Sequence, residues 1–445
     1  MNILLLSGGS GKRLWPLSNT VRAKQFIPVF RTPDGSYESM VQRVYRQLRA
    51  AAPEAPITVS TFRSQISSLR HQLGEDVFII AEPCRRDTFP AIALAAAYLH
   101  DVNGVSPEES VVVCPVDPYA GDDFFAMLPR MAKRAAESEA GLVLMGMQPD
   151  SPSEKYGYIL PAGRGECSPV AAFREKPDAA EAERLIAQGA LWNGGVFAFR
   201  LGTVLERTRE LLGFCDYRTI FQRYESLKAI SFDYAVVEHE SFAEVLRFPG
   251  KWEDIGTWNA LTEIMDGNTL GKALLDESCE NTCVINELDI PVLCLGIKNT
   301  VVAVSPQGVL VSDRERSAAV KPYVDALEEQ IMFAEKSWGS YRVLDAGENS
   351  LTVKLELKSG ASLSVHSHAH RSETWTVLSG RGTALVDGRT IELCAGDTLS
   401  LPQGSLHSLH AHTRLWVVET QLGSVIVRSD KQKYPAPPEW EELIK

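Results

Sequence analysis

The chain begins with the segment that most restricts its fold, a short apolar run that ends in a glycine-rich turn. Residues 1–6 read Met-Asn-Ile-Leu-Leu-Leu, and residues 7–16 read Ser-Gly-Gly-Ser-Gly-Lys-Arg-Leu-Trp-Pro. A continuous apolar run is typical of a parallel strand that is covered by helices on both faces. A glycine-rich turn after such a strand can present backbone N–H groups to phosphate oxygens. These residues therefore predict an α/β sheet whose first turn binds a phosphorylated ligand.

Two cationic side chains accompany this turn, and the turn does not match the common phosphate-binding motifs. Arg13 and Lys24 could neutralise the charge of a triphosphate. Gly11-Lys12 is followed by Arg13 rather than by Ser or Thr, so the P-loop motif is absent, and the glycines do not fit G-x-G-x-x-G.

The composition limits the class of protein. A chain of 445 residues predicts two to four domains, and a net charge of −12 argues against a protein that coats nucleic acid or a membrane surface. No apolar run is long enough for a membrane span, and residues 1–20 lack the basic start of a signal peptide. The eight cysteines are scattered, and only Cys279 and Cys283 are close together. We therefore expect a cytoplasmic protein with reduced thiols.

The texture of the sequence predicts an α/β domain followed by two β-rich parts. Over residues 1–265, short apolar strands alternate with helical stretches, which predicts a Rossmann-like, mixed or parallel sheet. Residues 266–317 contain short strands separated by turns, and residues 318–336 resemble a linker helix. Residues 337–430 become all-β with regularly spaced glycine turns, which favours a small barrel, and residues 431–445 form a tail.

Several motifs in the first 260 residues resemble one enzyme family. The pattern G-G-x-G-x-R-L-W-P-L-S at 8–18 and K-Q-F at 24–26 resemble the signature of sugar-1-phosphate nucleotidyltransferases, and most closely the mannose-1-phosphate guanylyltransferases. Further matching segments follow in family order at 82–91, 156–159, 173–177, 192–197, 233–235 and 252–258. The resemblance implies magnesium-dependent transfer of GMP from GTP to mannose 1-phosphate, with release of pyrophosphate.

The resemblance also implies roles for individual residues. Asp117 lies just after the apolar strand 111–114, in Cys114-Pro-Val-Asp117, where a carboxylate can hold Mg²⁺. The resemblance pairs it with Asp254 and adds Arg13 and Lys24 as catalytic residues. The expected nucleotide-binding residues are Leu6, Gly8, Gly9, Gly11, Lys12, Arg13, Glu82, Arg86 and Thr88. The expected sugar-phosphate-binding residues are Gly157, Glu175, Lys176, Asn193 and Gly194.

The chain departs from the family pattern near the expected nucleobase. Asp87 and Phe89 stand where the family has Asn and Ala, and Lys12 replaces a Thr or Ser. Two alternatives to the guanylyltransferase therefore remain open. One is transfer between another nucleoside triphosphate and another sugar 1-phosphate. The other is a non-catalytic protein that binds nucleotide sugars.

Six of the nine histidines lie between residues 366 and 412, in a pattern that predicts a metal site. The spacing from Gly360 to Gly380 fits the first cupin motif, and the spacing from Gly396 to His407 fits the second. Strand alternation predicts that His366, His368 and His370 share one face. The predicted ligands are His366, His368, Glu373 and His407. Three imidazoles and a carboxylate suit Zn, Fe, Mn, Ni or Co, while a barrel with a vestigial site remains the alternative.

The same segment resembles the C-terminal domain of bifunctional relatives that interconvert mannose 6-phosphate and fructose 6-phosphate. Their motif reads Q-x-H-x-H-R-x-E-H-W. Here His366 replaces the Gln and Thr374 replaces the third His, whereas His370 and Arg371 are kept as possible isomerase residues. The resemblance further implies a homodimer formed through the β segment 266–317. An alternative is that this domain is not an isomerase.

Overall fold

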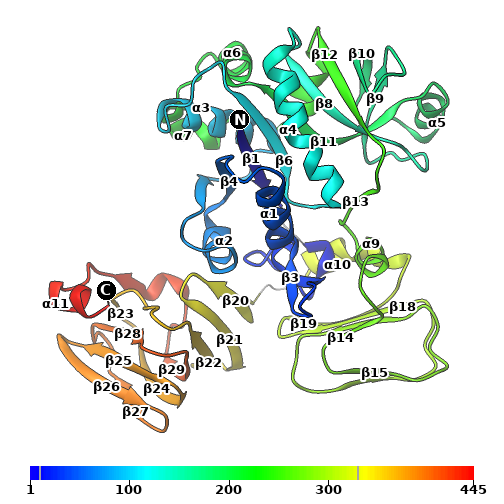
Figure 1. Ribbon diagram of the computed structural model, residues 1–445. Coiled ribbons are helices and arrows are strands. Elements are labelled where there is room, and N and C mark those ends of the chain that lie inside the picture. Colours follow the sequence, from blue (N-terminus) through cyan, green and yellow to red (C-terminus); the bar gives the residue numbers. More distant parts are fainter. Residues whose placement is uncertain (10–11, 328–329, 445) are drawn as a thin grey trace. The chain divides into compact units, whose positions relative to one another are not determined.

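The structure is a computed structural model that describes residues 1–9, 12–327 and 330–444. The chain divides into two compact units (Figure 1). The first unit comprises residues 1–14, 23–66 and 72–266, and the second comprises residues 15–22, 67–71 and 267–445. Among the described residues, no helix has both the length and the apolar character needed to cross a membrane.

A nine-stranded mixed sheet forms the centre of the first unit, in the order β5-β4-β1-β6-β11-β8-β12-β10-β9. The strands are β1 (Asn2–Ser7), β4 (Ile57–Phe62), β5 (Phe78–Glu82), β6 (Ser110–Pro115), β8 (Leu142–Met147), β9 (Gly157–Pro161), β10 (Cys167–Arg174), β11 (Leu191–Arg200) and β12 (Ala243–Phe248). β5, β4, β1 and β6 run parallel, whereas β11 runs antiparallel to β6 and β8. The carboxyl ends of β1 and β6 therefore meet at one edge of the sheet.

Helices cover both faces of this sheet, as the apolar runs predict. Leu4 and Val113 pack in one buried cluster with Ala93 and Ala97 of α3 (Thr88–Asp101). On the other face α4 (Asp122–Glu137) contacts β6, β8 and β11, and it also packs on α1 (Met40–Ala51). The remaining helices of four or more residues in this unit are α5 (Ala179–Ala187), α6 (Leu201–Leu212), α7 (Tyr217–Arg223), α8 (Phe232–Ala235) and α9 (Trp258–Glu263). Residues 67–71, the middle of α2 (Ile66–Leu73), are assigned to the second unit.

A small ribbon outside the main sheet brings distant residues together. β7 (Pro118–Ala120) pairs antiparallel with β13 (Trp252–Asp254), and the register places Asp254 opposite Pro118. A second ribbon pairs β2 (Pro28–Arg31) with β3 (Tyr37–Ser39). The first ribbon is the reason why residues that are far apart in the sequence can share one site.

The second unit contains a segment of short, mostly parallel strands. They are β14 (Thr269–Leu270), β15 (Ala273–Leu275), β16 (Cys283–Asn286), β17 (Val292–Cys294), β18 (Thr300–Ser305) and β19 (Gly308–Asp313). They form the sheet β14-β16-β18-β19 and the pair β15-β17 around a small core that includes Val284 and Val302. Leu274 and Leu293, which are opposite each other in the β15-β17 pair, are each 64% exposed.

The predicted linker helix over 318–336 is shorter than expected. The helical part covers Arg316–Ala319 and α10 (Val320–Asp325), and residues 328–329 lie outside the described part of the chain. Phe333–Lys336 form β20 instead, because they pair with β21 (Gly339–Ala346) and bury Ala334. Tertiary pairing therefore overrides the helical tendency at the end of this segment.

Two facing antiparallel sheets form the rest of the second unit, which we call the barrel. Their orders are β20-β21-β22-β29-β24-β27 and β26-β25-β28-β23-β30. The further strands are β22 (Ser350–Leu357), β23 (His366–His368), β24 (Arg371–Ser379), β25 (Arg381–Val386), β26 (Arg389–Cys394), β27 (Thr398–Leu401), β28 (His407–Ala411), β29 (Leu415–Gly423) and β30 (Lys431–Lys433). Trp375, Leu409 and Val417 are buried between the sheets.

The C-terminal residues take part in the barrel more than the sequence predicts. Lys431–Lys433, which the sequence assigns to a tail, form β30 and pair with β23. The chain then continues into α11 (Pro438–Leu443), whose Trp440 packs with Val365 and Leu385.

Candidate functional site

The first unit gathers one ammonium group and two carboxylates at the edge where β1 and β6 end. Lys24 Nζ lies 2.9 Å from Asp117 Oδ2 and 3.5 Å from Asp254 Oδ1, and it donates to the carbonyl oxygen of Ile255 at 3.0 Å. Asp117 closely follows β6, and Asp254 ends β13. The structure thus brings together three of the four residues that the sequence predicts to be catalytic.

The electrostatics of this group reflect its mixture of charges. Burial opposes the charge of Lys24, but Asp117 and Asp254 outweigh that effect and raise the pKa of the ammonium group. Burial raises the pKa of Asp254, and the negative charge of Asp117 raises it further. The positive charges of Lys24 and Arg13 lower it, but the net shift is upward. Arg13, the fourth predicted catalytic residue, comes from the short helix Lys12–Leu14 and is exposed. Two carboxylates with two cations nearby can bind a metal ion and a polyphosphate.

The glycine-rich turn rests on a buried network of amide and hydroxyl side chains. Gln65 Nε2 donates to the carbonyl oxygen of Gly9 at 3.0 Å, and Thr61 Oγ1 donates to that of Ser7 at 3.0 Å. Gln25 Nε2 also lies 3.3 Å from the Ser7 carbonyl oxygen and from Gln65 Oε1. These carbonyl groups point into the protein, so the Gly8 N–H points away from the network, because a peptide unit is planar and trans.

Sequence motifs did not single out Thr61 and Gln65, because each lies in an ordinary strand or turn and acts only through the fold. Gly9 has φ 144°, a conformation that favours glycine, and a Cβ there would meet no described atom within 4 Å. Leu6 is half-buried in β1 and Gly8 is exposed. The predicted nucleotide-binding residue Gly11 lies outside the described residues.

The segment expected at the nucleobase is more embedded than the sequence suggests. Glu82 is 4% exposed and accepts hydrogen bonds from Ser60 Oγ at 3.0 Å and from Tyr224 OH at 3.1 Å, and burial raises its pKa. Thr88 Oγ1 accepts from a backbone N–H of α8 at 2.8 Å. Arg86 donates to a main-chain oxygen of residue 225. These three side chains therefore already have partners within the unit.

The two substitutions in this segment have different locations. Asp87 is exposed, has φ 67° and caps α3 by accepting the N–H of Thr88 at 2.7 Å. Phe89 is 3% exposed and belongs to the core cluster around α3. Phe89 thus fills the interior rather than a nucleobase pocket.

The residues predicted to bind the sugar phosphate converge on the start of β9. A Cβ on Gly157 would lie 2.5 Å from Glu175 Oε2 and 3.4 Å from the Asn193 Cβ, so glycine is needed there for close approach. Glu175 Oε2 is buried and has no hydrogen-bond partner among the described residues, while Oε1 contacts Lys176 Nζ. A Cβ on Gly194 would contact the Met147 side chain too closely. The fold therefore brings all five predicted residues into one region.

Asp233 and three aromatic rings complete this region. Asn193 Nδ2 donates to Asp233 Oδ1 at 2.6 Å, and burial, followed by the negative charge of Glu175, raises the pKa of Asp233 to about 6. The ring of Tyr156 lies 4.9 Å from that of Trp192 and 5.4 Å from that of Trp252, between centroids. The two ring pairs are tilted and edge-to-face, at 54° and 71° between planes. Aromatic rings beside polar groups give this region both apolar surface and hydrogen-bonding groups.

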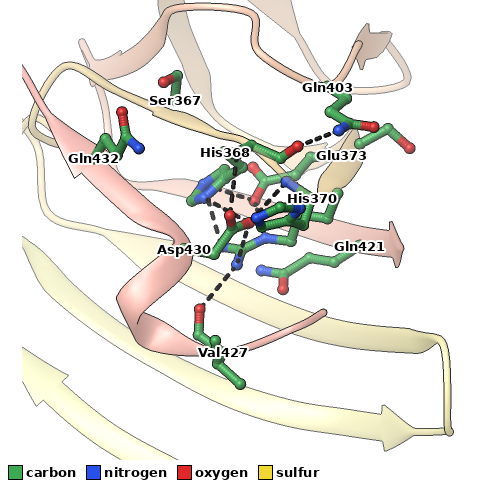
Figure 2. Close-up of polar contacts among 12 residues, drawn as sticks. Ser367, His368, His370, Glu373, Gln403, Gln421, Val427, Asp430 and Gln432 are labelled. Atoms are coloured by element: carbon green, nitrogen blue, oxygen red, sulfur yellow. Dashed lines mark hydrogen bonds and ion pairs between the residues drawn. The ribbon is translucent and has the colours of Figure 1, made fainter. Parts of the chain in front are cut away.

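The barrel holds a second cluster, which is fully buried. Ligand atoms from His366, His368, Glu373 and His407 all lie within 4.8 Å of one another. His368 Nε2 lies 3.1 Å from Glu373 Oε1, and His407 Nε2 lies 3.3 Å from Glu373 Oε2. β23 supplies two of these residues, β24 supplies Glu373, and β28 supplies His407. Figure 2 shows His368 and Glu373 facing each other inside the barrel.

The donor set of this cluster fits a divalent transition metal. Glu373 Oε2 and His407 Nε2 are buried, and apart from their contact of 3.3 Å with each other they have no hydrogen-bond partner among the described residues. Burial lowers the pKa of His366 to about 2, so its imidazole is neutral, which is the form that binds metals. Burial opposes the charge of Glu373, but contacts with His368 and His407 lower its pKa.

One sequence-based interpretation of this cluster is wrong, that His370 shares a strand face with His366 and His368. His370 is exposed and lies outside the cluster, because β23 ends at His368 and the Asp430 carboxylate accepts the N–H groups of Ala369 and His370 instead of a strand partner. Thr374, which replaces a family histidine, alternates away from the cluster and faces Ser400 on the outer side of β24. The loss of a histidine at 374 therefore leaves the cluster unchanged.

Arg371 and several buried polar residues surround the cluster. Arg371 Nε donates to Glu373 Oε1 at 3.1 Å, so the structure does place this predicted residue beside the ligands. Glu419 accepts from Trp375 Nε1 at 2.9 Å and from Gln421 Nε2 at 2.6 Å. Burial, together with the negative charge of Glu373, raises the pKa of Glu419 to about 7. Residues 419–423 read Glu-Thr-Gln-Leu-Gly and resemble the E-V-Q-x-G strand of the same family, but that resemblance assigns no role to Glu419.

Known proteins match both parts of the chain. The family model described as Nucleotidyl transferase matches residues 2–269, and the one described as Mannose-6-phosphate isomerase C-terminal matches residues 326–434. The Xanthan biosynthesis protein XanB of Xanthomonas campestris pv. campestris (strain B100) is 31% identical, with 96% of each chain covered. The Mannose-1-phosphate guanylyltransferase of Escherichia coli (strain K12) is 30% identical, with 97% of each chain covered.

A solved structure agrees with these matches. The crystal structure described as mannose-1-phosphate geranyltransferase from Thermus thermophilus is 30% identical, with a TM-score of 0.62, and the match covers 74% of this chain and 99% of that chain. The relatives are matched along almost their whole length, and the two family models match the parts of the chain that form the mixed sheet and the barrel. The chain is therefore a nucleotidyltransferase that belongs to the mannose-1-phosphate guanylyltransferase family and carries a C-terminal domain of the mannose-6-phosphate isomerase type.

Proposed function

We propose that the first unit transfers a guanylyl group from GTP to mannose 1-phosphate and releases pyrophosphate. The observation that carries this proposal is the convergence of Asp117 and Asp254 on Lys24 at the end of β6. A relative that is matched along 97% of its length is named for this activity. A protein that only binds nucleotide sugars has no need for a pair of carboxylates at this edge.

The chemistry is one in-line substitution at phosphorus. A phosphate oxygen of mannose 1-phosphate forms a bond to the α-phosphorus of GTP, and the bond from that phosphorus to the oxygen bridging to the β-phosphate breaks. The electron pair leaves with pyrophosphate, so no covalent intermediate with the enzyme is needed. Mg²⁺ held by Asp117 and Asp254 would neutralise charge on the phosphate oxygens. Arg13 and Lys24 would stabilise the negative charge of the transition state.

Substrate positioning is assigned to two regions of the unit. The turn at Gly8 and Gly9 would hold the triphosphate through backbone N–H groups, because the Gln65 amide and the Thr61 hydroxyl keep carbonyl oxygens of the turn directed inward. Glu175, Lys176 and Asn193 would hold the sugar phosphate, with the unpartnered Glu175 Oε2 accepting a sugar hydroxyl. The exact alignment of the two phosphates is the main contribution of such a site.

The test is pyrophosphate release with Mg²⁺, using four nucleoside triphosphates against mannose 1-phosphate and glucose 1-phosphate. Release confined to GTP with mannose 1-phosphate is the expected result. Release with another pair would keep the transfer chemistry and replace the substrates. No release with any pair, accompanied by binding of GDP-mannose, would favour the non-catalytic alternative.

We propose a second activity for the barrel, the isomerisation of mannose 6-phosphate and fructose 6-phosphate. The buried set of three imidazoles and one carboxylate supports it, as does the match of residues 326–434. A divalent transition metal in that set would polarise the oxygens of the open-chain sugar. Arg371 lies beside the ligands, and Glu419 could take or give a proton near neutral pH. EDTA-sensitive interconversion of the two sugar phosphates tests this, and no interconversion by the metal-loaded protein would refute it.

We also propose that the protein is a cytoplasmic homodimer that pairs through the β segment. Leu274, Leu293 and Leu295 are each more than 60% exposed, and Val309 and Val311 on β19 are also exposed. Adjacent exposed apolar side chains are typical of an interface. All eight cysteines are free thiols, which suits a reducing compartment. Light scattering of the wild type and of Leu293→Asp should give a dimer and a monomer, and a monomeric wild type would refute the dimer.

A further inference from the structure

The outer nitrogens of the three clustered imidazoles do not all have the same kind of partner. His366 Nδ1 lies 2.6 Å from the carbonyl oxygen of Ser364, and His407 Nδ1 lies 2.9 Å from that of Ser405. In both cases the partner is the backbone two residues earlier in the chain. Such contacts fix which ring nitrogen carries the proton and leave Nε2 directed at the cluster.

His368 lacks this local arrangement and faces a residue from far along the chain. Its Nδ1 is buried without a hydrogen-bond partner among the described residues, and Asp430 Oδ2 lies 3.9 Å away. Both side chains are 2% exposed. Figure 2 shows the Asp430 carboxylate reaching toward His368 from a separate segment. Asp430 lies well beyond the last residue of the second cupin motif, in no motif that the sequence reveals.

Asp430 belongs to residues 427–434, which we call the C-terminal strap. Its last strand, β30, pairs with β23 at His366, Ser367 and His368, whereas β28 is in register with β23 only at His366. The Asp430 carboxylate accepts the N–H of Ala369 at 3.1 Å. The strap is therefore the main partner of the strand that carries two of the four ligands.

Arg371 connects Asp430 to the cluster from the other side. Its Nη1 lies 3.6 Å from Asp430 Oδ2 and donates to the carbonyl oxygen of Val427 in the strap at 3.3 Å. Its Nη2 donates to His368 Nε2 at 3.2 Å. His368 Nε2 also lies 3.1 Å from Glu373 Oε1, so this is the nitrogen that faces the other ligands. When Nε2 binds a metal, the ring proton of His368 resides on Nδ1, which is the nitrogen that faces Asp430.

We propose that Asp430 is a positioning residue of the barrel's metal centre. Its carboxylate faces His368 Nδ1 at 3.9 Å, a longer separation than the hydrogen bonds that the other two imidazoles make with the Ser364 and Ser405 carbonyl oxygens, so it acts mainly through its charge. That negative charge favours a proton on Nδ1 and so leaves the Nε2 lone pair directed at Glu373 and His407. The C-terminal strap thereby becomes part of the site. This inference rests on the metal centre of the proposed function but not on isomerase activity.

The test compares metal binding by full-length variants with no activity assay. Each protein is stripped with a chelator and titrated with Co²⁺, whose visible spectrum reports the ligand geometry. Asp430→Asn keeps an oxygen that can accept the N–H of Ala369 but loses the negative charge. We expect it to bind Co²⁺ about 10- to 100-fold more weakly, with a changed spectrum.

A matched control removes the same charge elsewhere in the barrel. Asp397 Oδ2 also accepts a backbone N–H, that of Cys394 at 2.7 Å, but it faces no imidazole of the cluster. Asp397→Asn should bind Co²⁺ as the wild type does. Asp430→Glu, which restores the charge, should recover part of the affinity. Thermal melting of each metal-free variant identifies any that fail to fold.

Three outcomes would overturn the inference. One is wild-type Co²⁺ affinity and spectrum in Asp430→Asn. Another is equal weakening in Asp397→Asn, because the effect would then be general to the barrel. The third is a wild type that takes up no Co²⁺, which would refute the metal centre as well. If Asp430→Asn does not fold, Asp430→Glu compared with the wild type decides the question through its spectrum.

Discussion

The group of Lys24, Asp117 and Asp254 in the first unit and the cluster of His366, His368, Glu373 and His407 in the barrel differ in how far their polar side chains are exposed to water. At the transferase edge the side chains of Asp117 and Asp254 are 35% and 38% exposed, and Lys24 balances their charge. In the barrel, the side chains of His368, Glu373 and His407 are each 2% exposed, and the strands hold the ligand atoms within 4.8 Å. The first site is open and lies at the ends of strands, whereas the second is closed and lies inside the barrel.

This difference has a physical reason. A site that accepts two large anions must be accessible, so its charges stay near water and act mainly when substrates exclude that water. A site that holds one small cation can exclude water, because the bound cation offsets the free-energy cost of burying the carboxylate and the imidazoles. We therefore expect substitutions at the open site to affect rates, and substitutions at the closed site to affect metal affinity.

The largest expected effect is on transfer at the open site. Asp254→Asn should lower kcat/KM for pyrophosphate release by about 1000-fold, because a lost metal carboxylate removes several kcal/mol of transition-state stabilisation. Asp266→Asn is the control, since this exposed carboxylate faces Arg31 at 3.6 Å, away from the site. A fall of less than about tenfold in Asp254→Asn would contradict the assignment of the metal pair.

The next effect concerns the closed site. Glu373→Gln should weaken Co²⁺ binding by at least about 100-fold, because the cluster loses its carboxylate, the ligand that carries the negative charge. Glu392→Gln removes an exposed carboxylate that faces His412 on the outside of the same domain. Equal Co²⁺ affinity in the two variants, measured by competition with a chelating indicator, would show that the cluster is vestigial.

A pH profile sharpens the comparison on the sugar side. Asp233, with a pKa of about 6, is charged above that pH and then holds the Asn193 amide most strongly. We expect KM for mannose 1-phosphate to rise several-fold as the pH falls below about 6. The substrate phosphate also titrates in this range, so the same profile is measured for Asp233→Asn. In that variant KM should change with pH only as far as the substrate phosphate itself titrates. Identical profiles would exclude Asp233.

The raised pKa of Asp233 also predicts how the free energy of unfolding changes with pH. The folded form keeps the Asp233 proton up to about pH 6, whereas the unfolded form loses it near the ordinary value of 3.8. The unfolded state therefore binds fewer protons in this window, and the free energy of unfolding falls as the pH rises through it. Asp233→Asn should flatten this part of a denaturation profile.

The smallest expected effect tests the support of the glycine-rich turn. Thr61→Val removes the hydroxyl that donates to the Ser7 carbonyl oxygen and should raise KM for GTP about 2- to 10-fold, in line with one hydrogen bond. Thr61→Ser should restore it. Ser110→Ala removes a comparable buried bond, to the Ala132 carbonyl oxygen, at the opposite end of β6. It should lower the melting temperature without changing KM.

Much of the fold follows from local sequence. The apolar run of β1 and the glycines after it predict a buried strand and a tight turn, because both depend on neighbouring residues. The spacing of His366, His368, Glu373 and His407 also predicts the cluster, since strand alternation sets the faces of each pair. Strand alternation does not place His370 on the same face, because β23 ends two residues earlier, at His368.

What depends on distant partners could not be predicted in the same way. Phe333–Lys336 become a strand through β21, and Lys431–Lys433 become one through β23. Glu82 and Phe89 are drawn into the interior by residues of other elements. Each of these outcomes is decided by pairing or packing between segments that are separate in the chain.

The sequence by itself determined the family-like motifs, the alternation of strands and helices in the first 265 residues and the spacing of the four clustered residues His366, His368, Glu373 and His407, because these patterns are periodic and local. Only the tertiary structure decided that β7 and β13 place Asp254 beside Asp117, that Gln65 and Thr61 hold the glycine-rich turn, and that Asp430 reaches His368. The physical reason is that such contacts depend on how the sheets close, and closure is a property of the whole chain.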